Sequence, residues 1–206
     1  MATTSNYGWT TPDDSSLVKD GASAIRALGT AIDTSMNTAL GTKKAGLVLL
    51  NTTSFSAVAS QSVNDVFSST YDNYRIVIET TASSGNYLNF KLRVSGADDS
   101  SANYTWGMVN TTNGAAAFQL AGTNATTGFN VLRPGTSRNS CSFDIYSPNI
   151  ARATMYTGTQ SYNDGATVSI AGAIGGNHSV NTAYTGFTLI HAGTITGTVS
   201  VYGYNK

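Results

Sequence analysis

Charged side chains are scarce in this 206-residue sequence. Lys, Arg, Asp and Glu together make up 11% of it, about half the usual share, and the two signs cancel to a formal net charge of zero. This balance excludes a basic footprint for nucleic acid and a polybasic patch for an anionic membrane. Because a surface with so little charge repels its own copies weakly, the composition suits a subunit of an assembly.

Cysteine and glutamate occur once each, as Cys141 and Glu79. A single cysteine excludes an intrachain disulfide and a cysteine-based metal cluster, and we expect Cys141 to be a buried, unreactive thiol. With one glutamate, an acid–base pair would have to consist of aspartates. Helix capping explains Asp13–Asp14 and a turn explains Asp98–Asp99, so we predict no catalytic residue, no metal site and no cofactor.

Long apolar runs are also missing. The longest, AGLVLL at residues 45–50, is far too short to span a bilayer, and residues 1–5 have neither the basic nor the apolar region of a secretory signal. We therefore expect that the chain does not insert into a membrane. We also expect it to be made in a reducing cytoplasm, because it folds without a disulfide.

One amphipathic helix is predicted over residues 13–41. Pro12 and the two aspartates after it are typical of a helix start, and Gly41 is typical of a helix end. Its apolar residues repeat every seven positions, as a coiled-coil seam does: Val18, Ile25, Ile32 and Ala39, with Leu28 in the second series. Because this seam is narrow, we favour self-association over packing on the chain's own domain, but it does not fix the number of copies.

Residues 1–12 precede this helix and are polar apart from two isolated aromatic side chains, Tyr7 and Trp9. We interpret them as an extended arm that anchors the chain to another protein through these two rings. A frayed terminus is the alternative.

From residue 46 onwards the sequence consists of short strand patterns separated by turn residues. Residues 87–94, YLNFKLRV, alternate strictly between apolar and polar side chains, as in a half-buried strand. Further strands are expected at residues 75–78, 143–146, 153–156, 167–170, 186–190 and 198–202. About eight strands with no helical pattern between them predict a mainly β fold, with an antiparallel jelly-roll-like β-sandwich over residues 46–206.

Aromatic side chains are the best candidates for recognition in this head domain, because rings supply contact area at a low entropic cost. We expect Tyr104, Trp106 and Tyr184 to be exposed contact residues. Residues 110–128 and 172–186 are rich in Ser, Thr, Asn and Gly and are expected to form adaptable loops.

Three stretches of the chain resemble bacteriophage virion proteins. Residues 6–14, NYGWTTPDD, with the LVKDGA and AIRALG that follow, resemble the N-terminus of many phage tail-fibre and minor tail proteins. Residues 66–76, VFSSTYDNYRI, and residues 195–204, ITGTVSVYGY, resemble parts of phage virion β domains. The centre of the chain, about residues 100–185, carries no such match.

The resemblance implies a homotrimer in the virion, made in the cytoplasm of a host bacterium. The N-terminal arm would attach to tail or baseplate proteins, and the C-terminal head would point outward toward a host-surface glycan or protein. A head fibre, a capsid decoration protein or a baseplate or collar protein without host contact is the alternative. A polysaccharide depolymerase would need paired carboxylates, which the shortage of acidic residues disfavours.

Overall fold

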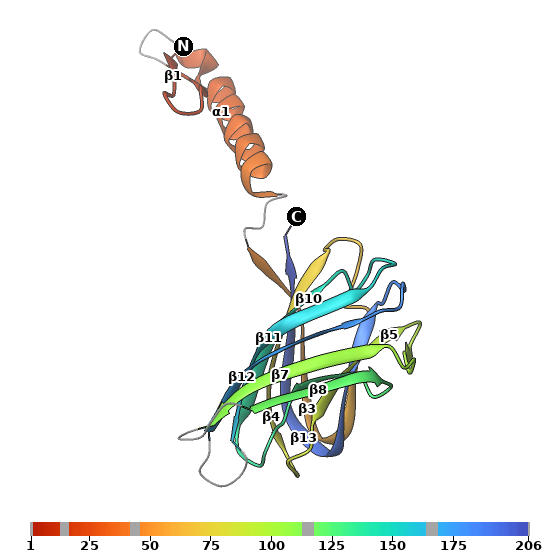
Figure 1. Cartoon of the computed structure of the whole chain (residues 1–206). Coiled ribbons are helices and arrows are strands. Elements are labelled where there is room, and N and C mark those ends of the chain that lie inside the picture. Colours follow the sequence, from red (N-terminus) through yellow and green to blue (C-terminus); the bar gives the residue numbers. More distant parts are fainter. Residues whose placement is uncertain (1, 13–16, 42–45, 113–117, 164–168, 206) are drawn as a thin grey trace. The chain divides into compact units, whose positions relative to one another are not determined.

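The computed structural model in Figure 1 describes residues 2–12, 17–41, 46–112, 118–163 and 169–205. The chain divides into two compact units, Met1–Gly46 and Leu47–Lys206. The first unit contains the described helices and a small hairpin, and the second consists of β-strands and their connections.

The first unit is a helix with a hairpin folded against it. Strands β1 (Ala2–Thr3) and β2 (Thr10–Thr11) pair antiparallel, and β2 contacts the helix. A 3₁₀ turn, Val18–Asp20, leads into α1 (Gly21–Met36), and a π-helical turn, Asn37–Gly41, follows it. The predicted helix is therefore present from Val18 on, while the predicted caps Asp13 and Asp14 lie outside the described residues. The expectation of an extended arm is wrong, because the arm closes its own backbone hydrogen bonds as a hairpin.

The second unit is an eleven-stranded antiparallel sheet. Its strands are β3 (Leu47–Val63), β4 (Asn73–Ala82), β5 (Leu88–Val94), β6 (Ala97–Asp98), β7 (Tyr104–Thr112), β8 (Phe118–Ala125), β9 (Phe129–Leu132), β10 (Asn139–Tyr146), β11 (Thr154–Asn163), β12 (Ser169–His178) and β13 (Gly186–Tyr204). The prediction of a mainly β fold after one helix is confirmed.

Strand β13 organises this sheet because it bends and pairs with different neighbours on its two halves. Residues 186–190 pair with β5, and residues 195–203 pair with β4, while β3 runs along the other side of both halves. The remaining strands continue from β4 in the order β10, β11, β12, β7 and β8. The sheet consequently curls on itself (Figure 1), and the two strands predicted at residues 186–190 and 198–202 are one.

The core lies inside the curl and is built from alternate residues of the strands. Phe90 of β5 stacks on Phe187 of β13 with ring centroids 4.3 Å apart, and its edge meets Phe143 of β10 at 5.2 Å. Tyr74 of β4 is also fully buried, and its hydroxyl accepts a hydrogen bond from the Ser68 N–H at 2.7 Å and donates one to the Ser68 carbonyl at 2.8 Å. Burying large rings with satisfied polar atoms stabilises the sheet's curvature.

Large parts of two regions expected to be loops are strands instead. In the first, residues 110–112 end β7 and residues 118–125 form β8, and residues 113–117 lie outside the described residues. In the second, residues 172–178 belong to β12. The outward-facing positions of β12 carry Ala171 and Ala173, and Gly175 and Gly176 carry no side chain. This composition hides the apolar–polar alternation by which strands are recognised.

Candidate interaction surfaces

The predicted seam of the helix is largely exposed in the single chain. None of the side chains of α1 is buried, and Ile25 at its centre is 64% exposed. Val18, in the 3₁₀ turn, is 97% exposed, and Leu28 and Ile32 are half-buried. The seam therefore leaves Val18 and Ile25 open to solvent, while Leu28 and Ile32 are partly covered within the chain.

The seven-residue register of this seam is regular only within α1. Ile25, Leu28 and Ile32 lie on one continuous α-helix, whereas Val18 lies in the 3₁₀ turn and Ala39 in the π-helical turn. Because these turns have different numbers of residues per turn, they rotate the end positions away from an ideal seam. The central three residues are consequently the best-defined part of the predicted seam.

The two arm aromatics have different environments. The indole Nε1–H of Trp9 donates a hydrogen bond to the Ser35 hydroxyl at 3.0 Å, and Tyr7 stacks on Trp9 with ring centroids 4.9 Å apart. Together with Met36 and Ala39 these residues enclose a hollow of about 220 Å³. Trp9 thus holds the hairpin on its own helix, and Tyr7 is left exposed.

The prediction that Tyr104 and Tyr184 are exposed contact residues of the head is wrong, because both side chains are fully buried. The Tyr104 hydroxyl accepts from the Leu92 N–H and donates to the Asp99 carbonyl, both at 3.1 Å, and the Tyr184 hydroxyl donates to the Asp99 carboxylate at 2.5 Å. Burial raises the pKa of both tyrosines, which keeps them protonated and able to donate. Partners inside the chain therefore let these rings enter the core.

Trp106, the third predicted contact residue, is half-buried beside two residues that sequence reasoning missed. Its ring packs over Gly122, where any side chain would collide with it, and lies 5.9 Å from the ring of Tyr87. The guanidinium of Arg133 sits 5.7 Å above the Tyr87 ring. This aromatic cluster of Tyr87, Trp106 and Arg133 combines two half-buried rings, which pack against the core, with an exposed cation, and only the long-range fold brings its members together.

His178 is the centre of a buried polar cluster. Its Nδ1 accepts a hydrogen bond from the Val180 N–H at 3.3 Å, so we place the ring proton on Nε2, which faces the Asp99 carboxylate at 3.3 Å. The Ser101 hydroxyl lies 3.4 Å from the same Nε2. A nucleophile relay needs its acid on one ring nitrogen and its hydroxyl on the other. Here both meet Nε2, and the cluster instead ties the segment after β12 to the segment before β7.

Two groups of this cluster have displaced pKa values. Burial lowers the pKa of His178 against the opposing attraction of Asp99. Burial alone would raise the pKa of Asp99, but hydrogen bonds from Ser101 and Tyr184 outweigh it and leave that pKa below its ordinary value. The cluster therefore holds a neutral imidazole beside an ionised carboxylate at neutral pH.

The carboxylates of Asp98 and Asp99, which the sequence places in a turn, both have partners within the chain. Asp98 accepts hydrogen bonds from the Arg93 guanidinium and, at 2.6 Å, from the Thr188 hydroxyl. Among the described residues, no three His, Cys, Asp or Glu side chains gather to hold a metal ion. Cys141 is buried as expected, and burial raises the pKa of its thiol.

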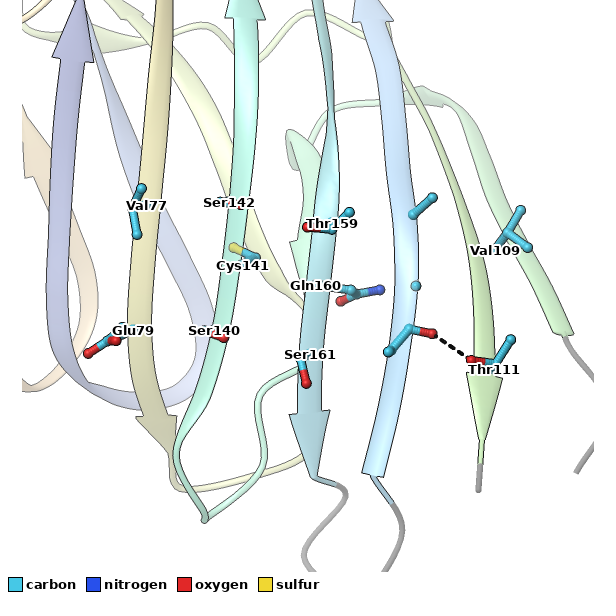
Figure 2. A pocket seen from close by; sticks show the side chains of 13 residues that line it. Val77, Glu79, Val109, Thr111, Ser140, Cys141, Ser142, Thr159, Gln160 and Ser161 are labelled. Carbon is cyan, nitrogen blue, oxygen red and sulfur yellow. Dashed lines mark hydrogen bonds between the residues drawn. The ribbon is translucent and has the colours of Figure 1, made fainter. Parts of the chain in front are cut away.

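A broad trough lies on the side of the sheet that faces away from the core. It has a volume of about 730 Å³ and spans β4, β10, β11, β12 and β7 (Figure 2). Apart from Glu79, its outward-facing side chains are small or carry hydroxyls: Val77, Ser140, Ser142, Thr159, Ser161, Ala171, Ala173, Val109 and Thr111. The Thr111 hydroxyl bonds to the Ala171 carbonyl at 3.2 Å and joins neighbouring strands across it.

The trough can bind by shape and by neutral hydrogen bonds. Glu79 is the one carboxylate among its lining residues, and it forms an ion pair with Arg138. A single paired carboxylate gives no second group for acid–base work. Hydroxyl and methyl groups at this density suit contact with another protein surface or with sugar hydroxyls.

Comparison with known protein families, with curated proteins and with solved structures gives no match. Among the described residues, no helix combines the length and the apolar character needed to cross a bilayer.

We expect the head to lose stability in acid because His178 is buried and neutral. The unfolded chain takes up a proton at this residue near pH 6.5, whereas the folded chain does so at lower pH, so the free energy of unfolding should fall as the pH drops from 7 toward 5. The free energy of unfolding should fall further below about pH 4. In that range Asp99 takes up a proton in the unfolded chain, whereas its lowered pKa keeps it ionised in the folded chain.

Urea denaturation at a series of pH values measures this dependence. A His178→Gln variant removes the titrating ring and should flatten the curve between pH 7 and pH 5. A variant curve with the same slope as the unmodified protein would show that His178 is not the responsible group.

Proposed function

We propose that this chain is a structural protein of a bacteriophage virion, of the tail-fibre type. Three copies associate through the seam of α1, the N-terminal hairpin attaches the trimer to other tail or baseplate proteins, and the jelly-roll-like head contacts a glycan or protein on the host surface. Each head needs only weak affinity in this arrangement, because several heads on one particle bind together.

The observation that carries this proposal is the exposed seam of α1. Helices of this length are marginal in water unless one face is packed, and α1 buries none of its side chains within the chain. Self-association through Ile25, Leu28 and Ile32 would supply the missing packing. The resemblance of residues 6–14 to the N-terminus of phage tail-fibre proteins supports the same arrangement and its virion setting.

The aromatic cluster of Tyr87, Trp106 and Arg133 is the part of the head that best suits host contact. Sugar rings present C–H faces that pack on aromatic rings, and acidic surface sugars carry carboxylates that pair with a guanidinium. Arg133 is exposed, and its Nε–H donates to the Gly85 carbonyl at 2.9 Å, which fixes its position beside the ring of Tyr87. We therefore assign the receptor contact to this cluster in place of Tyr104 and Tyr184.

A second function is favoured by the trough. Its ten outward-facing side chains include no aromatic ring. Glu79, the one carboxylate among its lining residues, is paired with Arg138 of the same chain. Such a neutral surface of small side chains suits packing against a neighbouring virion protein. A head fibre, a capsid decoration protein or a baseplate or collar protein would use the chain in this way, without touching the host.

Replacing Ile25 by Asp should separate the copies. A carboxylate in a helix–helix seam would be buried without a partner, which is costly enough to prevent association. Light scattering on the full chain should give three times 21.4 kDa, about 64 kDa, for the unmodified protein and the mass of one chain for the variant.

Ala27→Asp is the matched control, because Ala27 is exposed and lies on the opposite side of the same helix. It should keep the mass of the unmodified protein. A folded unmodified chain that runs as a monomer at micromolar concentration would remove both the seam and the avidity argument.

Replacing Arg133 by Ala should weaken binding of the labelled trimer to cells of a host strain. Loss of the cation costs each head about 1 kcal/mol, or about fivefold in affinity, and the trimer multiplies that loss. Arg138→Ala removes an equally charged, exposed side chain that pairs with Glu79 and lies outside the aromatic cluster, and it should leave cell binding unchanged.

Equal cell binding by both arginine variants and the unmodified protein would exclude the aromatic cluster as the receptor contact. Gold-labelled antibody on intact particles then separates the two functions, because label at the tail tip agrees with host contact and label on the capsid or collar agrees with the cementing role.

A further inference from the structure

A compact patch of apolar and aromatic side chains lies at one end of the head, on the face that points away from the core. Leu47 and Leu49 of β3 pair in register with Tyr204 and Tyr202 of β13, so the four side chains share one face of the sheet. Tyr146, at the end of β10, lies on the same face. Leu49 is 55% exposed, and Leu47 and Tyr146 are exposed as well. We call these five residues the β3-start patch.

Charges next to the β3-start patch are neutralised within the chain. Arg75 makes two parallel hydrogen bonds to the Asp144 carboxylate, at 2.8 and 2.9 Å, and the Tyr204 hydroxyl donates to the same carboxylate at 2.6 Å. The Arg75 guanidinium lies 6.0 Å from the centre of the Tyr204 ring. These contacts fix the Tyr204 ring in place, so little of its side-chain entropy remains to be lost on association.

The composition of the patch is typical of the buried centre of a protein interface. Tyrosine and arginine are enriched at the centre of protein interfaces, whereas unpaired charged side chains are depleted. The charged side chains beside this patch, Arg75 and Asp144, are paired with each other. Burial of Leu47 and Leu49 against a partner would also remove two large aliphatic side chains from water.

The backbone edge of β3 beside the patch is open. β3 pairs with β13 along one edge, and the other edge has no strand partner among the described residues. Its seventeen residues, LVLLNTTSFSAVASQSV, include no charged residue and no proline. Natural edge strands usually carry such residues as protection against pairing with another chain. The pairing of β3 with β13 shifts between Leu49 and Asn51 and again around Ala57, and residues 51–55 between these shifts pair in regular register.

We propose that the β3-start patch and the adjoining edge of β3 contact a second copy of this chain. The inference rests on the association of copies through α1 proposed above. Five residues, 42–46, separate the helical turn ending at Gly41 from Leu47, and they span at most about 18 Å when extended. Copies joined through their helices therefore bring their β3 starts within reach of one another, and the interface continues from the helix into the head.

Cysteine labelling of the full-length chain tests this proposal. Leu49→Cys is compared with Met155→Cys, whose position on β11 is 57% exposed, nearly the same as that of Leu49. The native Cys141 is buried and gives little background. We expect a maleimide to label Cys at position 49 about tenfold more slowly than Cys at position 155, because the second copy covers it. Leu47→Cys provides a second reporter if Leu49→Cys folds poorly.

The same pair of variants in the Ile25→Asp background supplies the control. Once the copies are separated, the two labelling rates should become equal. A trimer by light scattering with equal labelling rates in the unmodified helix background would overturn the β3 contact and leave the proposed function standing. A monomer would overturn both.

Discussion

A helix of sixteen residues in water needs a packed face, because its own hydrogen bonds leave it marginal. α1 has a row of aliphatic side chains suited to such packing, yet the chain leaves Ile25 and Val18 open to solvent. The hairpin covers part of the helix through Trp9 and Ser35, which leaves Ile25 exposed while Leu28 and Ile32 are half-buried. This unmet requirement is why we infer association of copies, and the proposed trimer, its avidity and the contact at β3 all depend on it.

The head meets its own packing requirement without help. Rings such as Phe90, Phe187 and Phe143 fill the interior of the curled sheet, and the hydroxyls of the buried tyrosines Tyr74, Tyr104 and Tyr184 find partners within the chain. Several charges on the remaining surface are paired within the chain, as in Arg75–Asp144 and Glu79–Arg138. A head that is complete in itself and neutral outside can be held close to its copies without repulsion, which fits the low charge of the whole sequence.

The sequence predicts the strands with strong alternation and misses those without it. Residues 87–94 alternate strictly and include β5, whereas residues 172–178 of β12, where alanine and glycine occupy the outer face, have the composition of a loop. The burial of Tyr104 and Tyr184 could not be predicted, because their partners Leu92 and Asp99 meet them only through the fold. The cluster of Tyr87, Trp106 and Arg133 was missed for the same reason. Local patterns predict elements, and sites assembled from distant strands need the pairing register.

Amide hydrogen exchange of α1 in the full chain, measured over a range of protein concentrations, tests the central claim most directly. Our account predicts that the amides of residues 25–32 are protected at high concentration and exchange progressively faster on dilution, because the helix depends on its copies. Protection that persists unchanged in a dilute monomer would contradict it.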